Sequence, residues 1–198
     1  MNKIPFVAKP GSAVTVELPD WVTELVDWDQ QYNTDDEKMA LAIELSRQNV
    51  LRGTGGPFGT AIFDRASGRL LGVGVNRVVP LTNSTLHGET VAIMLAEKAL
   101  GTFSLALDTG RELFTSCEPC AMCMGAVLWS GVNRLVCAGA AADARAIGFD
   151  EGPVFEQSYD YLRNAGIEVV RQFKRADAKA VLDYYKSSGG RIYNGKEA

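Results

Sequence analysis

The chain has little histidine and little cysteine, with one histidine and four cysteines among its 198 residues. This scarcity excludes a site built from several imidazoles, and four cysteines in a chain of this length do not suggest a disulfide framework. No apolar run approaches the ~20 residues that span a membrane, and the first residues do not read as a targeting segment. We expect one domain in a reducing compartment, in the cytoplasm.

An excess of basic charge is also missing, since the formal net charge is −4 and the isoelectric point is near 5.1. Proteins that hold a nucleic acid backbone usually carry a basic patch. Here a small cluster of Arg163, Arg171, Lys174 and Arg175 is countered by many acids. We therefore expect a small-molecule substrate, and neither a nucleic acid nor a membrane as partner.

The single histidine and a cysteine pair form a metal-binding pattern. His87 precedes Cys120 by 33 residues, and Cys123 follows Cys120 by three. Residues three apart on a helix share a face, so both thiolates can bind one ion. One neutral imidazole and two thiolates suit Zn²⁺ and leave a fourth tetrahedral position for water. The pattern predicts a catalytic zinc site.

Acidic and helix-start residues accompany these ligands. Glu89 lies two residues after His87, so its carboxylate can move protons beside the open position without binding the metal. Pro119 suits the first turn of a helix, whose positive end favours thiolate over thiol. His87 likewise precedes an apolar helical run, so two helix starts are expected to converge on the ion.

A closed structural zinc site is the alternative. Cys117 lies three residues before Cys120, and its thiolate would complete a set of one histidine and three cysteines. Pro119 separates Cys117 from the helix that carries the other two cysteines, which favours the open site. Cys137 is interpreted as a buried strand residue.

Periodicity predicts alternating helices and strands. The capping-box pattern of Thr34 and Glu37 predicts a helix from residue 35 to about Leu51. Strands are predicted over 58–63, 70–79, 112–116, 134–138 and 167–170, and further helices over 87–100, 119–129, 159–165 and 176–187. The first two strands form a hairpin, and the strand–helix–strand order from 112 to 138 implies parallel pairing. The result is an α/β fold, a mixed sheet of about five strands flanked by helices.

His-x-Glu followed by Pro-Cys-x-x-Cys is the signature of zinc deaminases that act on nucleobase rings. On these motifs the chain resembles the cytidine deaminase-like superfamily, and the resemblance implies that superfamily's three-layer fold. Further segments within residues 35 to 160 resemble the bacterial guanine deaminases of the superfamily. These segments are Gly55 to Gly59, Asn76, Thr115 to Cys120 with Gly125, Ala126 and Trp129, and Ala146 to Gly152.

The resemblance implies roles for the site residues. His87, Cys120 and Cys123 are expected to hold zinc, and Glu89 to be the main proton shuttle. Glu151 matches the second catalytic acid of the guanine-acting branch, although a solvated loop acid is the simpler interpretation.

The resemblance also implies contacts with the substrate. Asn76 is expected to hydrogen-bond the purine, and Phe58, Trp129 and Phe149 to wall the ring. Simpler interpretations are a strand-ending role for Asn76 and core packing for Phe58 and Trp129. Tyr193 is expected to close the pocket, with an ordered surface tail as the alternative.

Departures from the guanine-acting pattern keep other substrates open. Gly88 stands where these deaminases usually have alanine, and His-Gly-Glu is familiar from cytosine deaminases of the same superfamily. Residues 1–33 form a longer N-terminal extension, which we expect to pack on a deaminase domain of residues 34–198. The C-terminal segment of that domain is expected to close the active site, and the resemblance implies a homodimer.

The leading hypothesis is a zinc-dependent hydrolytic deaminase that converts guanine to xanthine and ammonia. Guanosine, cytosine and aminotriazines such as ammeline are alternative substrates, because each carries an amino group on an amidine-like carbon. A tRNA adenosine deaminase fits the acidic composition less well. A zinc-binding module without turnover is the alternative outside the enzyme class.

Overall fold

The computed structural model describes residues 11, 13–107 and 109–195. Its helices are α1 (Trp21–Leu25), α2 (Asp35–Leu51), α3 (Gly88–Leu100), α4 (Ala121–Ser130), α5 (Ala141–Ile147), α6 (Glu156–Asn164) and α7 (Arg175–Ser187). Its strands are β1 (Gly59–Asp64), β2 (Leu70–Val75), β3 (Arg111–Cys117), β4 (Arg134–Gly139) and β5 (Glu168–Val170).

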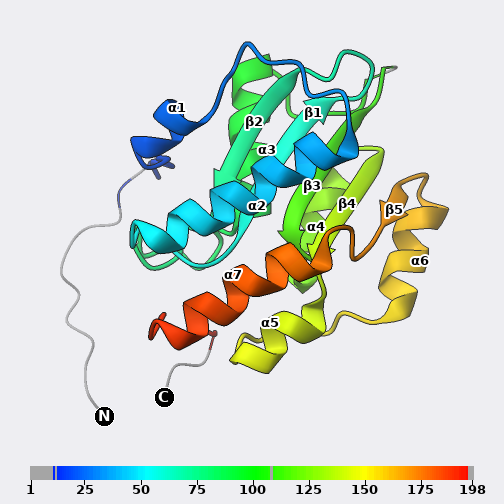
Figure 1. Ribbon diagram of the computed structural model, residues 1–198. Helices are drawn as coiled ribbons and strands as arrows, with labels where there is room; N and C mark the ends of the chain where they lie inside the picture. The colour runs from blue at the N-terminus through cyan, green and yellow to red at the C-terminus, as the bar shows by residue number, and fades with distance from the viewer. Residues whose placement is uncertain (1–10, 12, 108, 196–198) are drawn as a thin grey trace.

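One mixed sheet organises the chain, with strand order β2-β1-β3-β4-β5. β1 pairs antiparallel with both β2 and β3, whereas β3, β4 and β5 run parallel. α2 and α7 lie side by side over one face, and α3 and α4 cover the other (Figure 1). This is the predicted three-layer α/β fold, and every strand of the prediction is present.

Both faces of the central strands are buried, so each layer of helices has its own apolar core. The cluster under α2 and α7 includes Phe63, Phe114 and Met39, and the cluster under α3 and α4 includes Leu113 and Leu135. Near-continuous burial of β3 and β4 is expected for parallel strands covered on both sides.

The boundaries of α2, α3 and α7 lie within one residue of the predictions, whereas those of α4 and α6 differ, since α6 begins at Glu156 and not at residue 159. No helix was predicted at α1. The predicted capping box is present, with Thr34 and Glu37 bonded reciprocally at the start of α2. The prediction that the cysteine helix begins at Pro119 is wrong, because α4 begins at Ala121 with Cys120 as its N-cap. The main chain of Glu118 still bonds to Gly139 of β4, which keeps this stretch extended.

Two further differences lie in the second strand and in α5. β2 ends at Val75 and not at residue 79, because the Asn76 side chain accepts a hydrogen bond from the Val78 main chain and starts a turn. α5 was not predicted from the sequence. Its start is held by the Asp143 carboxylate, which accepts from the Ala140 amide at 3.0 Å and pairs with Arg175.

The N-terminal segment contributes to the core where the structure describes it. Trp21, Val22, Val26 and Tyr32 belong to the cluster under α2. Residues 1–10 and 12 of the predicted extension lie outside the described residues. Among the helices described, none is both long enough and apolar enough to cross a membrane.

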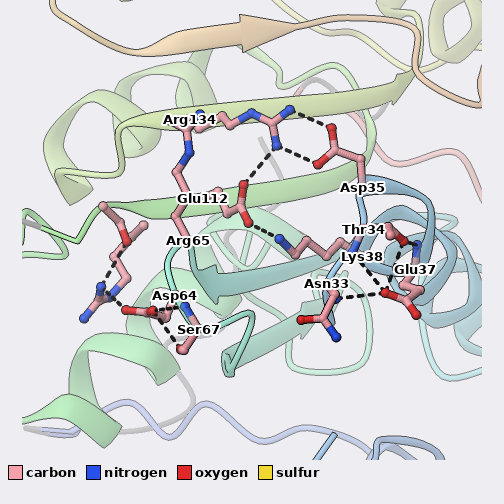
Figure 2. A network of polar contacts seen from close by, with 12 residues as sticks. Asn33, Thr34, Asp35, Glu37, Lys38, Asp64, Arg65, Ser67, Glu112 and Arg134 are labelled. Carbon is pink, nitrogen blue, oxygen red and sulfur yellow. Dashed lines mark hydrogen bonds and ion pairs between the residues drawn. The ribbon is translucent and has the colours of Figure 1, made fainter. Parts of the chain in front are cut away.

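A buried ion network joins α2 to β3 and β4 at the end of the sheet where these two strands begin (Figure 2). Glu112 pairs with the ammonium of Lys38 and, at 2.9 Å, with the guanidinium of Arg134. Arg134 also bonds to Asp35 at 2.6 Å and 2.8 Å, and this contact holds the pKa of Asp35 below its usual value. Lys38 is 5% exposed and Glu112 is 1% exposed, so each charge depends on its partners.

We expect Glu112→Gln to lower the free energy of unfolding by about 3–5 kcal/mol, because it leaves the Lys38 ammonium buried without its carboxylate. Asp183→Asn is the matched control, since it removes an exposed partner of Lys179 and should cost below about 1 kcal/mol. Urea denaturation measures both values. Equal losses in the two variants would show that the network contributes no more than a surface pair.

Candidate active site

Two helix starts converge at the end of the sheet where β3 and β4 finish. His87 is the N-cap of α3 and Cys120 is the N-cap of α4, and both have extended backbone angles that turn the chain into the helix. Cys123 lies within the first turn of α4. One ligand atom from each of these three side chains lies within 4.8 Å of the other two. The structure thus brings together the predicted metal-binding residues.

The donor set of this group fits zinc. A histidine nitrogen, Nδ1, lies 3.5 Å from the Cys120 sulfur, and Cys123 is fully buried. A hydrogen bond from the Cys123 thiol lowers the pKa of Cys120 to about 4, which makes Cys120 a thiolate. Nitrogen and thiolate donors are the ligands that Zn²⁺ prefers.

Cys117 lies outside this group. Its thiol is buried and makes a hydrogen bond of 3.7 Å to the Ala140 carbonyl. Burial raises the pKa of Cys117 well above the usual value, so it stays a thiol. The geometry therefore favours the open site over the closed set with three cysteines.

Glu89 is a buried acid beside the metal-binding group. It stands in the first turn of α3 and accepts a hydrogen bond of 3.4 Å from the Thr115 hydroxyl. Burial raises the pKa of Glu89, and the negative charge of Cys120 raises it further. A carboxyl group with a raised pKa can both accept and donate protons near neutral pH.

Glu151 is a second buried acid, 6% exposed, in the loop after α5. Its main-chain carbonyl accepts from the Ala121 amide at 3.0 Å, which ties the loop to the start of α4. Burial, followed by the charges of Cys120 and Glu89, raises the pKa of Glu151 to about 8. Glu151 is therefore not a solvated loop acid, which was the simpler interpretation from the sequence.

The pKa of His87 is raised although burial alone would lower it. The hydrogen bond with Cys120 and the negative charges of Cys120, Glu89 and Glu151 outweigh the effect of burial. The site is therefore electronegative, and this favours a bound cation.

Two connected cavities open onto the group. An inner cavity of about 30 Å³ and an outer cavity of about 500 Å³ share His87, Cys120, Glu151 and Tyr193 among their lining residues. Glu89 lines the inner cavity. The outer cavity has the size of a small-molecule site.

Aromatic side chains form one wall of the inner cavity. Phe58 and Phe149 both line it, and their ring centroids lie 5.1 Å apart in an edge-on contact. Tyr193, from the C-terminal segment, meets Phe149 edge-on at the same distance. Asn194 holds this segment in place, since its side chain accepts from the Asp150 amide and donates to the Gly148 carbonyl.

Asn76 lies at the end of β2, next to this wall. Its main-chain amide donates to the Phe58 carbonyl at 3.0 Å, and its side-chain oxygen accepts from the Val78 amide at 3.2 Å. The side-chain nitrogen is buried and has no hydrogen-bond partner within the residues that the structure describes. Asn76 therefore ends the strand and keeps an unpartnered side-chain nitrogen, but it is fully buried and is not among the described residues that line the two cavities.

Trp129 fits neither sequence interpretation. It is 84% exposed, so it does not pack in the core, and it is absent from the described residues that line the two cavities. Trp129 follows Met122 by seven residues and therefore shares its outward stripe on α4, whereas Cys123 faces inward. The structure therefore does not bring Trp129, which was predicted to wall the ring, to either of these cavities.

Sequence reasoning missed several residues of the site. Glu118 is buried, and its carboxylate accepts from the Ala141 amide and from Arg171, which fixes the ends of β3 and β4 together. Thr82, Asn83 and Ser84 line the outer cavity. Their only signal in the sequence is a polar stretch between a strand and the His87 helix.

Comparison with known proteins places the chain in a family. The family model of the cytidine and deoxycytidylate deaminase zinc-binding region matches residues 32–139. The guanine deaminase of Bacillus subtilis (strain 168) is 36% identical over 116 residues, which cover 59% of this chain and 71% of that protein.

Solved structures extend the similarity along the chain. A guanine deaminase from Nitrosomonas europaea is 40% identical with a TM-score of 0.85, and the match covers 91% of this chain and 100% of that one. A protein solved in complex with 2,6-diaminopurine is 42% identical, also with a TM-score of 0.85, over 92% of this chain and 97% of that one. The chain therefore belongs to the family defined by the cytidine and deoxycytidylate deaminase zinc-binding region.

Proposed function

We propose that this protein is a zinc-dependent guanine deaminase, which hydrolyses guanine to xanthine and ammonia. It is a hydrolase acting on C–N bonds of cyclic amidines. The observation that carries the proposal is the match of the whole Nitrosomonas europaea guanine deaminase structure at 40% identity. The two buried acids beside the His87, Cys120 and Cys123 group supply the proton-transfer chemistry that the reaction needs.

The metal-binding residues and Glu89 account for the water side of the reaction. His87, Cys120 and Cys123 would hold zinc, which, when bound, lowers the pKa of water from about 16 toward 7. Glu89 lies beside this group and takes a proton from the attacking water. It then returns the proton to the ring nitrogen next to C2.

Other residues account for the recognition of the ring and for departure of the amine. Glu151 accepts a hydrogen bond from the N1–H of guanine. It then takes the proton of the new hydroxyl group on C2 and passes it to the amine, so that the C2–N bond breaks, ammonia departs and an oxo group remains. The free donor of Asn76 binds O6. Phe58 and Phe149 flank the purine ring of guanine. Their side chains lie edge-on to each other and line the inner cavity, which supports this role.

The C-terminal segment closes the site within its own chain. Tyr193 lines both cavities, and a Cβ atom on Gly56 would lie 2.1 Å from the Tyr193 hydroxyl oxygen. This close approach supports a deaminase domain of residues 34–198 whose C-terminal segment around Tyr193 covers the pocket. Burial of Trp21, Val22 and Val26 supports packing of the described part of the 1–33 extension on that domain.

An exposed apolar surface on the α3 and α4 side supports a homodimer, and the four free cysteines support a cytoplasmic location. It includes Met94 on α3, Met122 and Trp129 on α4, and Phe103, which is 91% exposed. Leu105 bonds to Ser130 at the end of α4, so the loop with Phe103 lies near this helix. Exposed apolar side chains that gather on one side of a protein mark interfaces, and a two-fold axis would place this side against its own copy.

The substrate is tested by ammonia release from guanine, guanosine, cytosine and ammeline, with and without a chelator. We expect the highest kcat/KM for guanine, loss of activity with the chelator and recovery with added zinc. Activity on cytosine but not on guanine would refute the proposed guanine specificity. Cytosine is included because the His-Gly-Glu motif is familiar from cytosine deaminases. Inactivity on every compound would favour a binding module.

The two acids are tested by Glu89→Gln and Glu151→Gln. We expect Glu89→Gln to abolish turnover and Glu151→Gln to lower it by about 10²–10⁴-fold, because each removes a proton acceptor. Zinc content, measured by atomic absorption, should stay at one per chain in both. Near-normal turnover in Glu151→Gln would remove this residue from the mechanism.

The dimer is tested by Trp129→Asp, which places a charge in the exposed apolar surface. We expect sedimentation of the wild-type protein as a dimer and of the variant as a monomer. Tyr184→Asp, on the exposed side of α7, is the control and should leave the dimer intact. A dimer that survives Trp129→Asp unchanged would place the interface elsewhere.

A further inference from the structure

We propose that Asn49 is a positioning residue for Asn76, and that Trp21 of the N-terminal segment takes part through Thr54. The inference rests on the proposed function, because it assigns Asn76 the contact with guanine O6. Asn49 is on α2 and lies outside the described lining of both cavities at the site. It acts through main-chain and side-chain hydrogen bonds.

Asn49 is fully buried, and its amide joins three segments of the chain. The side-chain nitrogen donates to the Gly56 carbonyl at 2.8 Å and to the Asn76 carbonyl at 3.0 Å. The side-chain oxygen accepts from the Thr54 hydroxyl at 2.8 Å. A buried amide is costly unless it is bonded, and here both N–H groups and the oxygen are in use.

These bonds fix the main chain of Asn76 from both sides. Its amide is bonded to Phe58, which directly precedes β1, and its carbonyl to Asn49 of α2, so these two segments together set the position of the residue. The Val78 amide then fixes the side-chain oxygen, and the unpartnered nitrogen is left as the donor that can meet a ligand. A shift of the Asn76 carbonyl group would therefore also move the side-chain nitrogen of Asn76.

Glycine makes the close approach of these segments possible. A Cβ atom on Gly55 would lie 1.9 Å from the Asn76 carbonyl oxygen and 2.6 Å from the Asn49 side-chain nitrogen. Gly56, held by Asn49, faces the Tyr193 hydroxyl on its other side. The same amide thus supports Asn76 and the loop on which the closing tyrosine rests.

Trp21 extends this network to the N-terminal segment. Its indole nitrogen donates to the Thr54 hydroxyl at 3.0 Å, and that hydroxyl donates to Asn49. Arg77, the neighbour of Asn76, bonds to the Thr54 carbonyl. Trp21 is 6% exposed, and the Arg52 guanidinium lies 5.7 Å from its ring centroid, so the indole has one fixed orientation. Two hydrogen bonds therefore connect α1 to the residue that holds Asn76.

The test is a double-mutant cycle of Asn49→Ala and Asn76→Ala, read as kcat/KM for guanine. We expect Asn49→Ala to lower kcat/KM by about 10- to 100-fold in the wild-type background, because misplacement of a binding group has costs of this size. In the Asn76→Ala background the same change should lower it by less than about 2-fold. Additive losses in the cycle would overturn the proposal.

Two further variants separate positioning from stability. Ser46→Ala removes another buried polar group from α2 and should leave kcat/KM within about 2-fold of the wild type. Trp21→Phe removes one N–H donor and keeps an aromatic ring, so it decides the question if Asn49→Ala fails to fold. We expect about a 3-fold loss from Trp21→Phe that vanishes in the Asn76→Ala background. A lower melting temperature with unchanged kcat/KM would indicate a structural role only.

The outcome is distinguishable from failure of the proposed function. A wild-type protein without guanine turnover would refute the function, and crystal structures would then test the positioning directly. We expect Asn49→Asp, which loses the amide donors, to shift the Asn76 main chain and side chain. An unchanged Asn76 in that structure would overturn the proposal.

Discussion

The meeting of two helix starts at the end of the parallel strands is the constraint on which the rest of the site depends. His87 and Cys120 are N-caps of α3 and α4, so the end of each helix points at the same small volume. Both helix starts are positive, and hydrogen bonds with Cys123 and His87 stabilise the Cys120 thiolate there. Glu89 follows His87 by two residues, and Glu151 is tied to Ala121, so both acids are carried to the metal-binding group by the same two helices.

Two buried polar centres of different character lie at opposite ends of β3 and β4. At the start of the strands, Glu112 and Arg134 are paired with each other and with Lys38 and Asp35, and this centre joins α2 to the sheet. At the other end, the carboxyl groups of Glu89 and Glu151 are buried with raised pKa values. Removal of one partner from a set of buried paired charges destabilises a fold, whereas acids with raised pKa values beside a cavity are typical of catalysis.

Local signals in the sequence were sufficient for much of the fold and for the metal-binding group. Residues close together in the chain predicted the capping box at Thr34, the hairpin of β1 and β2, and the grouping of Cys120 with Cys123. The structure contains all three. Burial of Glu151 could not be predicted, since it depends on how a loop folds over α4. The exposure of Trp129 was missed because hydrophobicity alone does not show which face of a helix is covered.

Contacts between residues far apart in the chain could not be predicted from the sequence either. Lys38 and Glu112 are separated by 74 residues, and Asn49 and Asn76 by 27. A lysine or asparagine within a helix is usually solvated, and only the packing of α2 on the sheet turns these two side chains inward. The relay from Trp21 to Asn76 follows from that packing and has no pattern of its own.

X-ray absorption at the zinc edge of the purified protein would show whether His87, Cys120 and Cys123 alone bind the ion. We expect two sulfur ligands, one histidine nitrogen and one further light atom at each zinc ion, with an unchanged spectrum in Cys117→Ser. A third sulfur ligand that disappears in Cys117→Ser, or a protein that binds no zinc, would contradict this expectation.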